Sequence, residues 1–220
     1  MLVARGWALV FDLDGVVIDS MPMHTKSWQM YLEQFGIASH DIEERMHGRR
    51  NDEIVTHFFG AGLSPSEVIA HGAAKERLFR EMMRSELTSH LVPGVADFLN
   101  SAGNVKIGLA SNAEPANIDF VLDGAGLRER FDVIIDGHQV SRAKPFPDIY
   151  LRAAELLGAR PQHCVIFEDS PTGIQAACAS GAKVVAVHTH PSPLPKTDVS
   201  IPDFRDPALH SWLASLPPAV

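Results

Sequence analysis

Two carboxylates follow the first apolar run of the chain, at a spacing that suits metal or phosphate chemistry. Asp12 and Asp14 come directly after the apolar run 7–11, and Gly15 allows the backbone to turn away behind them. Residues i and i+2 of an extended chain point to the same side, so the two carboxylates can converge on one ligand. Burying an unpaired carboxylate is costly, so we expect the pair to face a cation or solvent. The pattern alone is equally typical of a strand end with two solvated acids.

Polar, reactive side chains also follow three later apolar runs. Ser111 and Asn112 end the second run, Lys144 comes soon after the third, and the fourth leads into Glu168 and Asp169. Parallel strands place their carboxyl ends on one edge of a sheet, where doubly wound sheets bind ligands. We therefore expect all of these side chains to meet the first two carboxylates at one edge.

This combination of residue types predicts phosphoryl transfer. Several carboxylates around one point repel each other, and Mg²⁺ relieves that repulsion while leaving room for phosphate oxygens. Lys144, the hydroxyl of Ser111 and the backbone near Asn112, which precedes a predicted helix start, are suitable donors to a phosphoryl group. In this scheme Asp12 attacks phosphorus and forms an aspartyl-phosphate, and Asp14 serves as general acid and base.

The elements that must position these residues alternate between strand and helix. Apolar runs predict strands at residues 7–11, 105–111, 132–136, 164–167, 183–187 and 199–201. Helical patterns predict helices at residues 95–102, 116–124, 148–157, 171–181 and 207–213. This alternation predicts an α/β fold with a doubly wound, parallel, Rossmann-like sheet.

Residues 20–89 contain helical patterns and no convincing strand. Ser20 predicts a capping hydroxyl with Pro22 in the first turn, and Ser64 to Glu67 form a capping box. We expect an inserted, all-helical cap domain at 20–89, and a core formed by 1–19 and 90–220. This cap is expected to close over the site and select the leaving group.

The composition excludes several classes of protein. The 220 residues are 45% hydrophobic and carry a net charge of −8, which gives no electrostatic footprint for nucleic acid. Two cysteines are too few for a disulfide framework, and no apolar run approaches the roughly 20 residues that span a bilayer. Asp12 and Asp14 interrupt the early apolar run, which argues against a signal peptide. We expect a cytoplasmic protein with no membrane, nucleic-acid or obligate protein partner.

Four motifs resemble those of the haloacid dehalogenase superfamily of phosphatases. They are Asp12-Leu-Asp14-Gly15, Ala110-Ser111-Asn112, Lys144-Pro145 and Glu168-Asp169-Ser170-Pro171-Thr-Gly173. The resemblance covers essentially the whole chain and implies a Rossmann-like core with Mg²⁺ as cofactor. It also implies a set of roles: Asp12 as nucleophile, Asp14 as acid and base, Ser111 and Lys144 as phosphate ligands, and Mg²⁺ held by the Asp12 side chain, the Asp14 main-chain oxygen and Asp169, with Glu168 at or just outside the ligand shell.

The insertion resembles the cap of the β-phosphoglucomutase-like branch of this superfamily. His24 and Trp28 match that branch, in which the histidine helps to control the acid and base; a satisfied core histidine is the alternative. Gly48 matches the cap glycine, and the neighbouring Arg49 and Arg50 are candidate substrate contacts or, alternatively, solvated surface charges. His188 and His190 have metal-like spacing but are more typical of a loop.

Departures from the mutase pattern favour hydrolysis over phosphoryl shuttling. The mutases carry a lysine where this chain has His47, an arginine where it has Asn51, and a lysine and asparagine where it has Glu114 and Pro115. Without those groups a bisphosphorylated intermediate would be held poorly. The leading hypothesis is therefore a Mg²⁺-dependent phosphatase for a small phosphorylated metabolite, such as a sugar phosphate. The alternatives are a sugar phosphomutase and, from another class, a non-catalytic aspartyl-phosphate switch resembling a receiver domain, which is about half this length.

Overall fold

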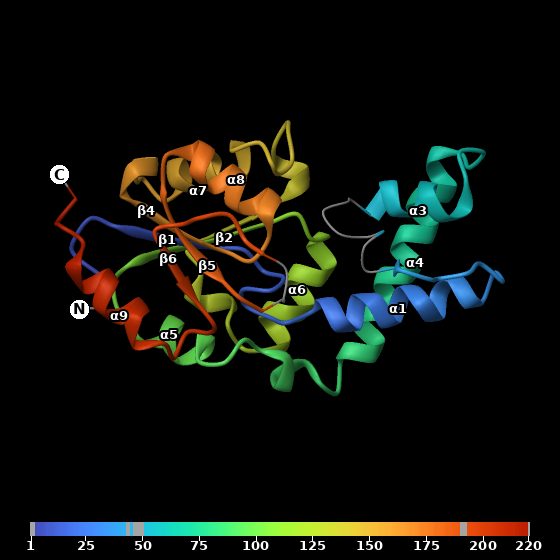
Figure 1. Cartoon of the computed structure of the whole chain (residues 1–220), viewed down its shortest axis with the longest axis horizontal. Coiled ribbons are helices and arrows are strands. Elements are labelled where there is room, and N and C mark those ends of the chain that lie inside the picture. Colours follow the sequence, from blue (N-terminus) through green and yellow to red (C-terminus); the bar gives the residue numbers. More distant parts are fainter. Residues whose placement is uncertain (1–2, 43–44, 46–50, 190–192, 220) are drawn as a thin grey trace. The chain divides into compact units, whose positions relative to one another are not determined.

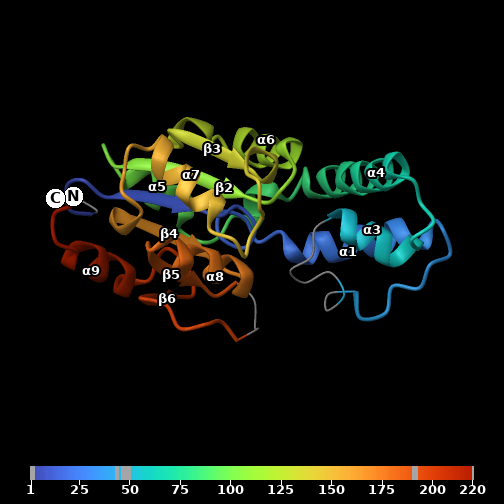
Figure 2. The same ribbon diagram turned by 90° about the horizontal axis from the view of Figure 1, so that it is seen from above.

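Six parallel strands form the sheet on which the larger part of the chain is built. The structure is a computed structural model that describes residues 3–42, 45, 51–189 and 193–219. Its strands are β1 (Ala8–Phe11), β2 (Lys106–Ser111), β3 (Val133–Asp136), β4 (Cys164–Glu168), β5 (Lys183–Val187) and β6 (Val199–Ile201). They lie in the order β3-β2-β1-β4-β5-β6, and every neighbouring pair is parallel (Figure 2). This is a doubly wound order, so the predicted fold class is confirmed.

Helices cover both faces of this sheet because alternate strand residues point to opposite sides. Helices α7 (Asp148–Leu156) and α8 (Pro171–Ser180) lie above the sheet in Figure 1, and α5 (Val95–Ser101) and α9 (Pro207–Ser215) lie below it. On the α7 and α8 side, Val10 and Ile166 pack into an aliphatic cluster with Ile149. On the other side, the rings of Phe11 and Phe167 stack with centroids 4.5 Å apart.

One further helix and four short turns of 3-10 helix complete the part of the chain described so far. Helix α6 (Pro115–Gly124) follows β2, and single turns of 3-10 helix occur at η1 (Leu87–His90), η2 (Arg128–Arg130), η3 (Gly137–Gln139) and η4 (Pro161–His163). Close to η1, Ile18 pairs with Leu91 in an antiparallel bridge, and Asp19 N donates to His90 O at 2.8 Å. These bonds join the two segments at which the chain leaves and re-enters the unit.

The chain divides into two compact units. One comprises Met1–Asp19 with Thr88–Val220, and the other is Ser20–Leu87. The second unit contains α1 (Met21–Glu33), α3 (Asn51–Phe59) and α4 (Pro65–Met83), and its described residues include no strand. Among all residues that the structure describes, no helix combines the length and apolar character that crossing a bilayer requires.

The two helix starts predicted in the helical unit have different outcomes. Ser64 caps α4 as expected, since its side chain accepts from Glu67 N while Glu67 Oε2 accepts from Ser64 N at 2.7 Å. The sequence predicts the same role for Ser20 at the start of α1, and this prediction is wrong. The Ser20 side chain makes no capping hydrogen bond, because the residue has helical backbone angles and is completely buried. Trp28 and Phe58 form part of the core of this unit.

Candidate active site

The site begins where β1 and β4 end side by side. These two strands are neighbours in the sheet, and the chain order reverses between them, which is where doubly wound sheets place ligands. Phe11 pairs with Phe167 in the parallel register, and Asp12 N donates to Phe167 O at 3.0 Å. Asp12, which follows β1, and Glu168, the last residue of β4, therefore lie together at the carboxyl edge of the sheet.

A tight turn follows Asp12 and brings the chain close to Asp169. Leu13 O accepts from the backbone N–H groups of Val17 and Ile18 at 2.8 and 3.1 Å, which closes the turn. Gly15 has a φ of +72°, and a Cβ atom at this position would overlap the Asp169 carboxylate. Glycine is required here for both reasons, because any side chain would displace Asp169 from the site.

A buried lysine bridges two of the carboxylates. Lys144 Nζ lies 2.9 Å from Asp12 Oδ1 and 2.7 Å from Glu168 Oε1, and its side chain is only 5% exposed. Burying an ammonium group costs desolvation energy, and the two carboxylates offset that cost by pairing with its charge. The lysine that the sequence placed after the third strand thus reaches the first and fourth strand ends.

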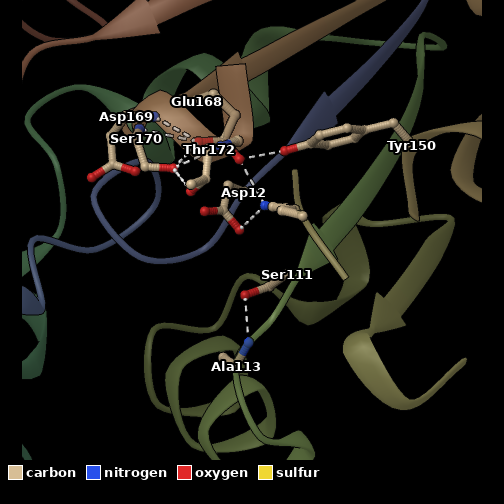
Figure 3. Close-up of polar contacts among 10 residues, drawn as sticks. Asp12, Ser111, Ala113, Tyr150, Glu168, Asp169, Ser170 and Thr172 are labelled. Carbon is tan, nitrogen blue, oxygen red and sulfur yellow. Dashed lines mark hydrogen bonds and ion pairs between the residues drawn. The ribbon is translucent and has the colours of Figure 1, made fainter. Parts of the chain in front are cut away.

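Glu168 is completely buried and uses both of its carboxylate oxygens. Oε1 accepts from Lys144 Nζ and from the Tyr150 hydroxyl. Oε2 accepts from Asp169 N at 3.0 Å, Ser170 N at 3.2 Å and Ser170 Oγ at 3.1 Å (Figure 3). Five donors thus converge on one carboxylate, which satisfies the charge that burial would otherwise penalise.

The start of α8 holds this arrangement in place. Ser170 Oγ accepts from Gly173 N at 3.0 Å, as an N-cap does, and Pro171 occupies the first turn. A Cβ atom on Gly173 would overlap the Glu168 carboxylate. The helix start can therefore approach the carboxylate only because a glycine stands there.

The electrostatics of the cluster favour a further cation. Burial raises the pKa of Asp12 to about 7, and the charges of Glu168 and Asp14 add to the rise while Lys144 opposes it. Burial, followed by Glu168, Asp12 and Asp14, raises the pKa of Asp169 well above its ordinary value. Burial alone would lower the pKa of Lys144, but Asp12 and Glu168 outweigh it and raise that pKa. The carboxylates thus resist ionising together, although Lys144 lies beside two of them.

The carboxylates have the geometry of a metal site. Asp12, Glu168 and Asp169 each offer an oxygen, and the three oxygens lie within 4.8 Å of one another. Hard divalent cations prefer oxygen ligands of this kind, and such a charge would lower the pKa of Asp12 and Asp169. The residues present therefore fit a hard divalent cation.

The predicted phosphate ligands of β2 lie at the same edge of the sheet. Leu109 pairs with Phe11, so Ser111 at the end of β2 lies beside the turn that follows β1. Ser111 is buried, and its Oγ accepts from Ala113 N at 3.0 Å, just before α6 (Figure 3). Asn112 is exposed. The hydroxyl hydrogen of Ser111 is not used by this bond, so it can be donated to an anion.

The predicted cap residues lie in the helical unit or outside the described residues. His24 is on α1, where its ring stacks on Phe79 and Nδ1 lies 3.0 Å from Lys75 Nζ. Lys75 is buried and also pairs with Glu76. Gly48, Arg49, Arg50 and His190 lie outside the residues that the structure describes.

Three buried polar residues have no distinguishing mark in the sequence. Tyr150 fits the apolar pattern of α7, so its ring satisfies the core and its hydroxyl is overlooked, although a buried hydroxyl needs a partner. Lys75 and Glu76 fall within the long helical pattern of the insertion, where charged residues are typical of a solvated face. No signal in the sequence separates these two from their exposed neighbours.

Comparisons with known proteins agree with this geometry. A model of the haloacid dehalogenase-like hydrolase family matches residues 8–181. The chain is 32% identical over 183 residues to a fructose-1-phosphate phosphatase of Escherichia coli (strain K12), covering 81% of this chain and 95% of that protein. It is 33% identical over 190 residues to a β-phosphoglucomutase of Bacillus subtilis (strain 168), covering 82% of each.

A solved structure shows the same fold. The β-phosphoglucomutase of Clostridium difficile superposes with a TM-score of 0.78 at 26% identity, covering 89% of this chain and 90% of that one. The chain therefore belongs to the haloacid dehalogenase-like hydrolase family. The family assignment made from the four motifs, and with it the assignment as an enzyme, is confirmed.

Proposed function

We propose that this chain is a Mg²⁺-dependent phosphatase that hydrolyses a small phosphorylated metabolite, a sugar phosphate, through an aspartyl-phosphate on Asp12. The observation that carries the proposal is the buried contact between Asp12 and Lys144, 2.9 Å apart at the switch point of the sheet. A carboxylate paired with an ammonium group is the arrangement that a nucleophile needs toward a dianionic phosphate. Relatives named as a fructose-1-phosphate phosphatase and a β-phosphoglucomutase support a sugar phosphate as substrate.

The proposed reaction has two displacements at phosphorus. A carboxylate oxygen of Asp12 forms a bond to phosphorus while the bond to the leaving oxygen breaks, and Asp14 donates a proton to that oxygen. Asp14 then removes a proton from water, which attacks the aspartyl-phosphate and releases phosphate and the free Asp12 carboxylate. Asp14 lies close enough for its charge to raise the pKa of Asp12, which supports its part in both steps.

Lys144 and Ser111 are proposed to hold the phosphoryl group. The ammonium group is already beside the nucleophile, so it can neutralise charge on the transferring oxygens without moving far. The Ser111 hydroxyl and the N–H groups that precede α6 add donors from the neighbouring strand end. Together they would orient the phosphate for in-line attack.

The cation is assigned to a subset of the acidic residues. We propose that the side chains of Asp12 and Asp169 and the main-chain oxygen of Asp14 hold it, where it would neutralise the phosphoryl oxygens and keep Asp12 ionised. Glu168 contributes charge rather than a ligand in this proposal, because both of its oxygens already accept hydrogen bonds.

Hydrolysis is favoured over a mutase reaction, which the similarity to β-phosphoglucomutases keeps as the second candidate. A mutase must hold a second phosphate. Two of the positions that depart from the mutase pattern carry no cation: Asn51 packs near Gly72 of α4, and Glu114 precedes α6.

We also propose that the helical unit serves as the cap domain, with His24 in its substrate-selecting region. The enzyme is proposed to act in the cytoplasm, because phosphorylated sugars are too polar to cross a bilayer.

A panel of phosphorylated metabolites tests the proposal. We expect phosphate release that requires Mg²⁺ and is lost in Asp12→Asn, whereas the matched control Asp123→Asn, which alters an exposed ion pair with Arg128, keeps it. Absence of Mg²⁺-dependent release across the panel, or release that survives Asp12→Asn, contradicts the proposal. Interconversion of hexose 1- and 6-phosphates, stimulated by a hexose bisphosphate and with little net phosphate release, would identify the mutase instead.

A further inference from the structure

We propose that Tyr150 is a positioning residue whose hydroxyl determines how the charge of Lys144 is shared between Glu168 and the phosphoryl group. The inference rests on the proposed function for the identity of that group. It assigns a chemical role to the hydroxyl of a side chain whose ring could also be explained by packing in the hydrophobic core alone. Tyr150 acts through Glu168, because its hydroxyl contacts the glutamate and not the proposed nucleophile.

The contacts of Tyr150 are unusual for a core aromatic residue. The residue lies on α7, is 1% exposed and packs in the aliphatic cluster between this helix and the sheet. Its hydroxyl donates to Glu168 Oε1 (Figure 3), and Lys144 Nζ lies 5.0 Å from the centre of its ring. The ring thus forms one wall beside the ammonium group, and the hydroxyl acts on the carboxylate that binds this group.

Glu168 Oε1 has two donors, and they compete. Its other oxygen accepts from Asp169 N and from Ser170, so the two residues that lead into α8 fix the position of the carboxylate. On Oε1, the Tyr150 hydroxyl supplies one hydrogen bond and Lys144 supplies the other, at 2.7 Å. A buried carboxylate oxygen that loses a donor attracts its remaining partner more strongly.

Lys144 is shared between two acids at almost equal distances. Its Nζ lies 2.7 Å from Glu168 and 2.9 Å from Asp12. Without the tyrosine hydroxyl, the ammonium group would be drawn toward Glu168 and away from Asp12, where the phosphoryl group is proposed to bind. The hydroxyl therefore keeps the ammonium group available to phosphate.

Tyr150→Phe isolates this effect because it removes the hydroxyl and keeps the ring. We expect the inhibition constant of inorganic phosphate and the KM of a phosphomonoester to rise about tenfold, with a smaller change in kcat, because hydrogen bonds to buried charges have this magnitude. The matched control is Tyr31→Phe, which removes the only other tyrosine hydroxyl of the chain, bonded to His71 in the helical unit. This control should leave both constants unchanged.

A double variant tests whether Tyr150 acts through Glu168. In a Glu168→Gln background, Tyr150→Phe should change phosphate binding by much less than about tenfold, because the charge that attracts Lys144 is then absent. An unchanged KM and phosphate inhibition constant in Tyr150→Phe, whatever its thermal stability, would overturn the proposal and leave a purely structural tyrosine. Full additivity with Glu168→Gln would overturn it as well.

A measurement that leaves Tyr150 intact covers the case in which Tyr150→Phe does not fold. In the Tyr31→Phe protein the single remaining tyrosine can be labelled with ¹³C at Cζ. Titration with Mg²⁺ and inorganic phosphate should shift its resonance along the phosphate binding curve, since Lys144 then moves relative to Glu168. A resonance that stays fixed while phosphate binds would overturn the proposal.

The failure of this proposal can be told apart from failure of the proposed function. A wild-type protein that binds phosphate but releases none from any substrate contradicts the hydrolase, and the binding and resonance measurements still decide the role of Tyr150. A wild-type protein that binds no phosphate contradicts both.

Discussion

Replacing the proposed nucleophile is expected to stabilise the metal-free protein at alkaline pH while abolishing hydrolysis. Asp12 is 8% exposed and lies among other acids, with Lys144 as its close cation. Burial raises its pKa from the ordinary 3.8 to about 7, with Glu168 and Asp14 adding to the rise. The amide introduced by Asp12→Asn carries no charge into this cluster, so the variant escapes the cost that the ionised aspartate imposes on the folded state.

The sign follows from proton binding. Between about pH 4 and pH 7 the folded protein holds the Asp12 proton more firmly than the unfolded chain does, because its pKa is raised on folding. The contribution of this group to stability is therefore fully present below about pH 4 and is lost as pH rises through about 7. A pKa displaced from 3.8 to about 7 corresponds to a loss on the order of 4 kcal/mol.

Urea denaturation of both proteins in the presence of a chelator measures this loss. Between about pH 5 and pH 8, the free energy of unfolding of Asp12→Asn minus that of the wild type should increase by about 2–3 kcal/mol. The control Asp123→Asn, at an exposed position, should show a difference that is constant within about 0.5 kcal/mol. Mg²⁺ should then stabilise the wild type more than Asp12→Asn, since it binds the folded state through that carboxylate.

Two results would refute this reasoning. If the stability difference does not grow between the two pH values, Asp12 is ionised in the folded protein at both. The cost of burying its charge beside other acids is then offset more fully than the contacts of the cluster indicate. If Asp12→Asn is the less stable protein at pH 8, the attraction to Lys144 outweighs burial and repulsion together. Either result would remove the electrostatic argument for a cation at this site.

Three further substitutions test the supports of the site. Gly173→Ala should lower the melting temperature by several degrees, against the usual gain for alanine in a helix, because its Cβ would overlap Glu168; Gly62→Ala, with open space around it, should not. Lys144→Met should lower kcat/KM by about 10²–10³-fold in the phosphatase assay, as loss of a charge-stabilising donor does, and an active variant would exclude its proposed role. Asp14→Asn should lower kcat by about 10²–10⁴-fold with no fall in the unfolding midpoint, and retained turnover would contradict its part in proton transfer.

Much of the core fold could be predicted from the sequence because burial leaves a clear pattern. The run at 164–167 is continuously apolar and becomes β4, buried on every residue. Pro171 marks the start of α8 by its chemistry, and Ser64 and Glu67 mark that of α4. Ser20 is an exception, since its hydroxyl stands at the N-cap position but makes no capping hydrogen bond, and its backbone angles are helical.

The main residues of the site could be predicted for a related reason. A charged group directly after a buried strand is expensive to place anywhere except at a functional edge, so Asp12 and Glu168 stand out in the sequence. Lys144 does not follow its strand directly, yet its position in the chain order still placed it at the same edge, where it contacts both acids.

The residues that support the site could not be predicted, because each of them also fits an ordinary turn or core pattern in the sequence. The sequence marks Gly15 as a turn residue, and the stronger constraint, the lack of room for a Cβ beside Asp169, depends on a contact across 154 positions that only the folded chain shows. Tyr150 satisfies the apolar face of α7 with its ring, so nothing in the spacing reveals the hydroxyl bond to Glu168. The proposed catalytic side chains depart from the burial pattern and are visible for that reason, whereas the residues proposed to position them conform to it. The distribution of charge at this site therefore follows only from the side-chain contacts. For Tyr150→Phe, the sequence pattern predicts no effect on phosphate binding, because the ring is kept, whereas the bond from the hydroxyl to Glu168 predicts weaker phosphate binding.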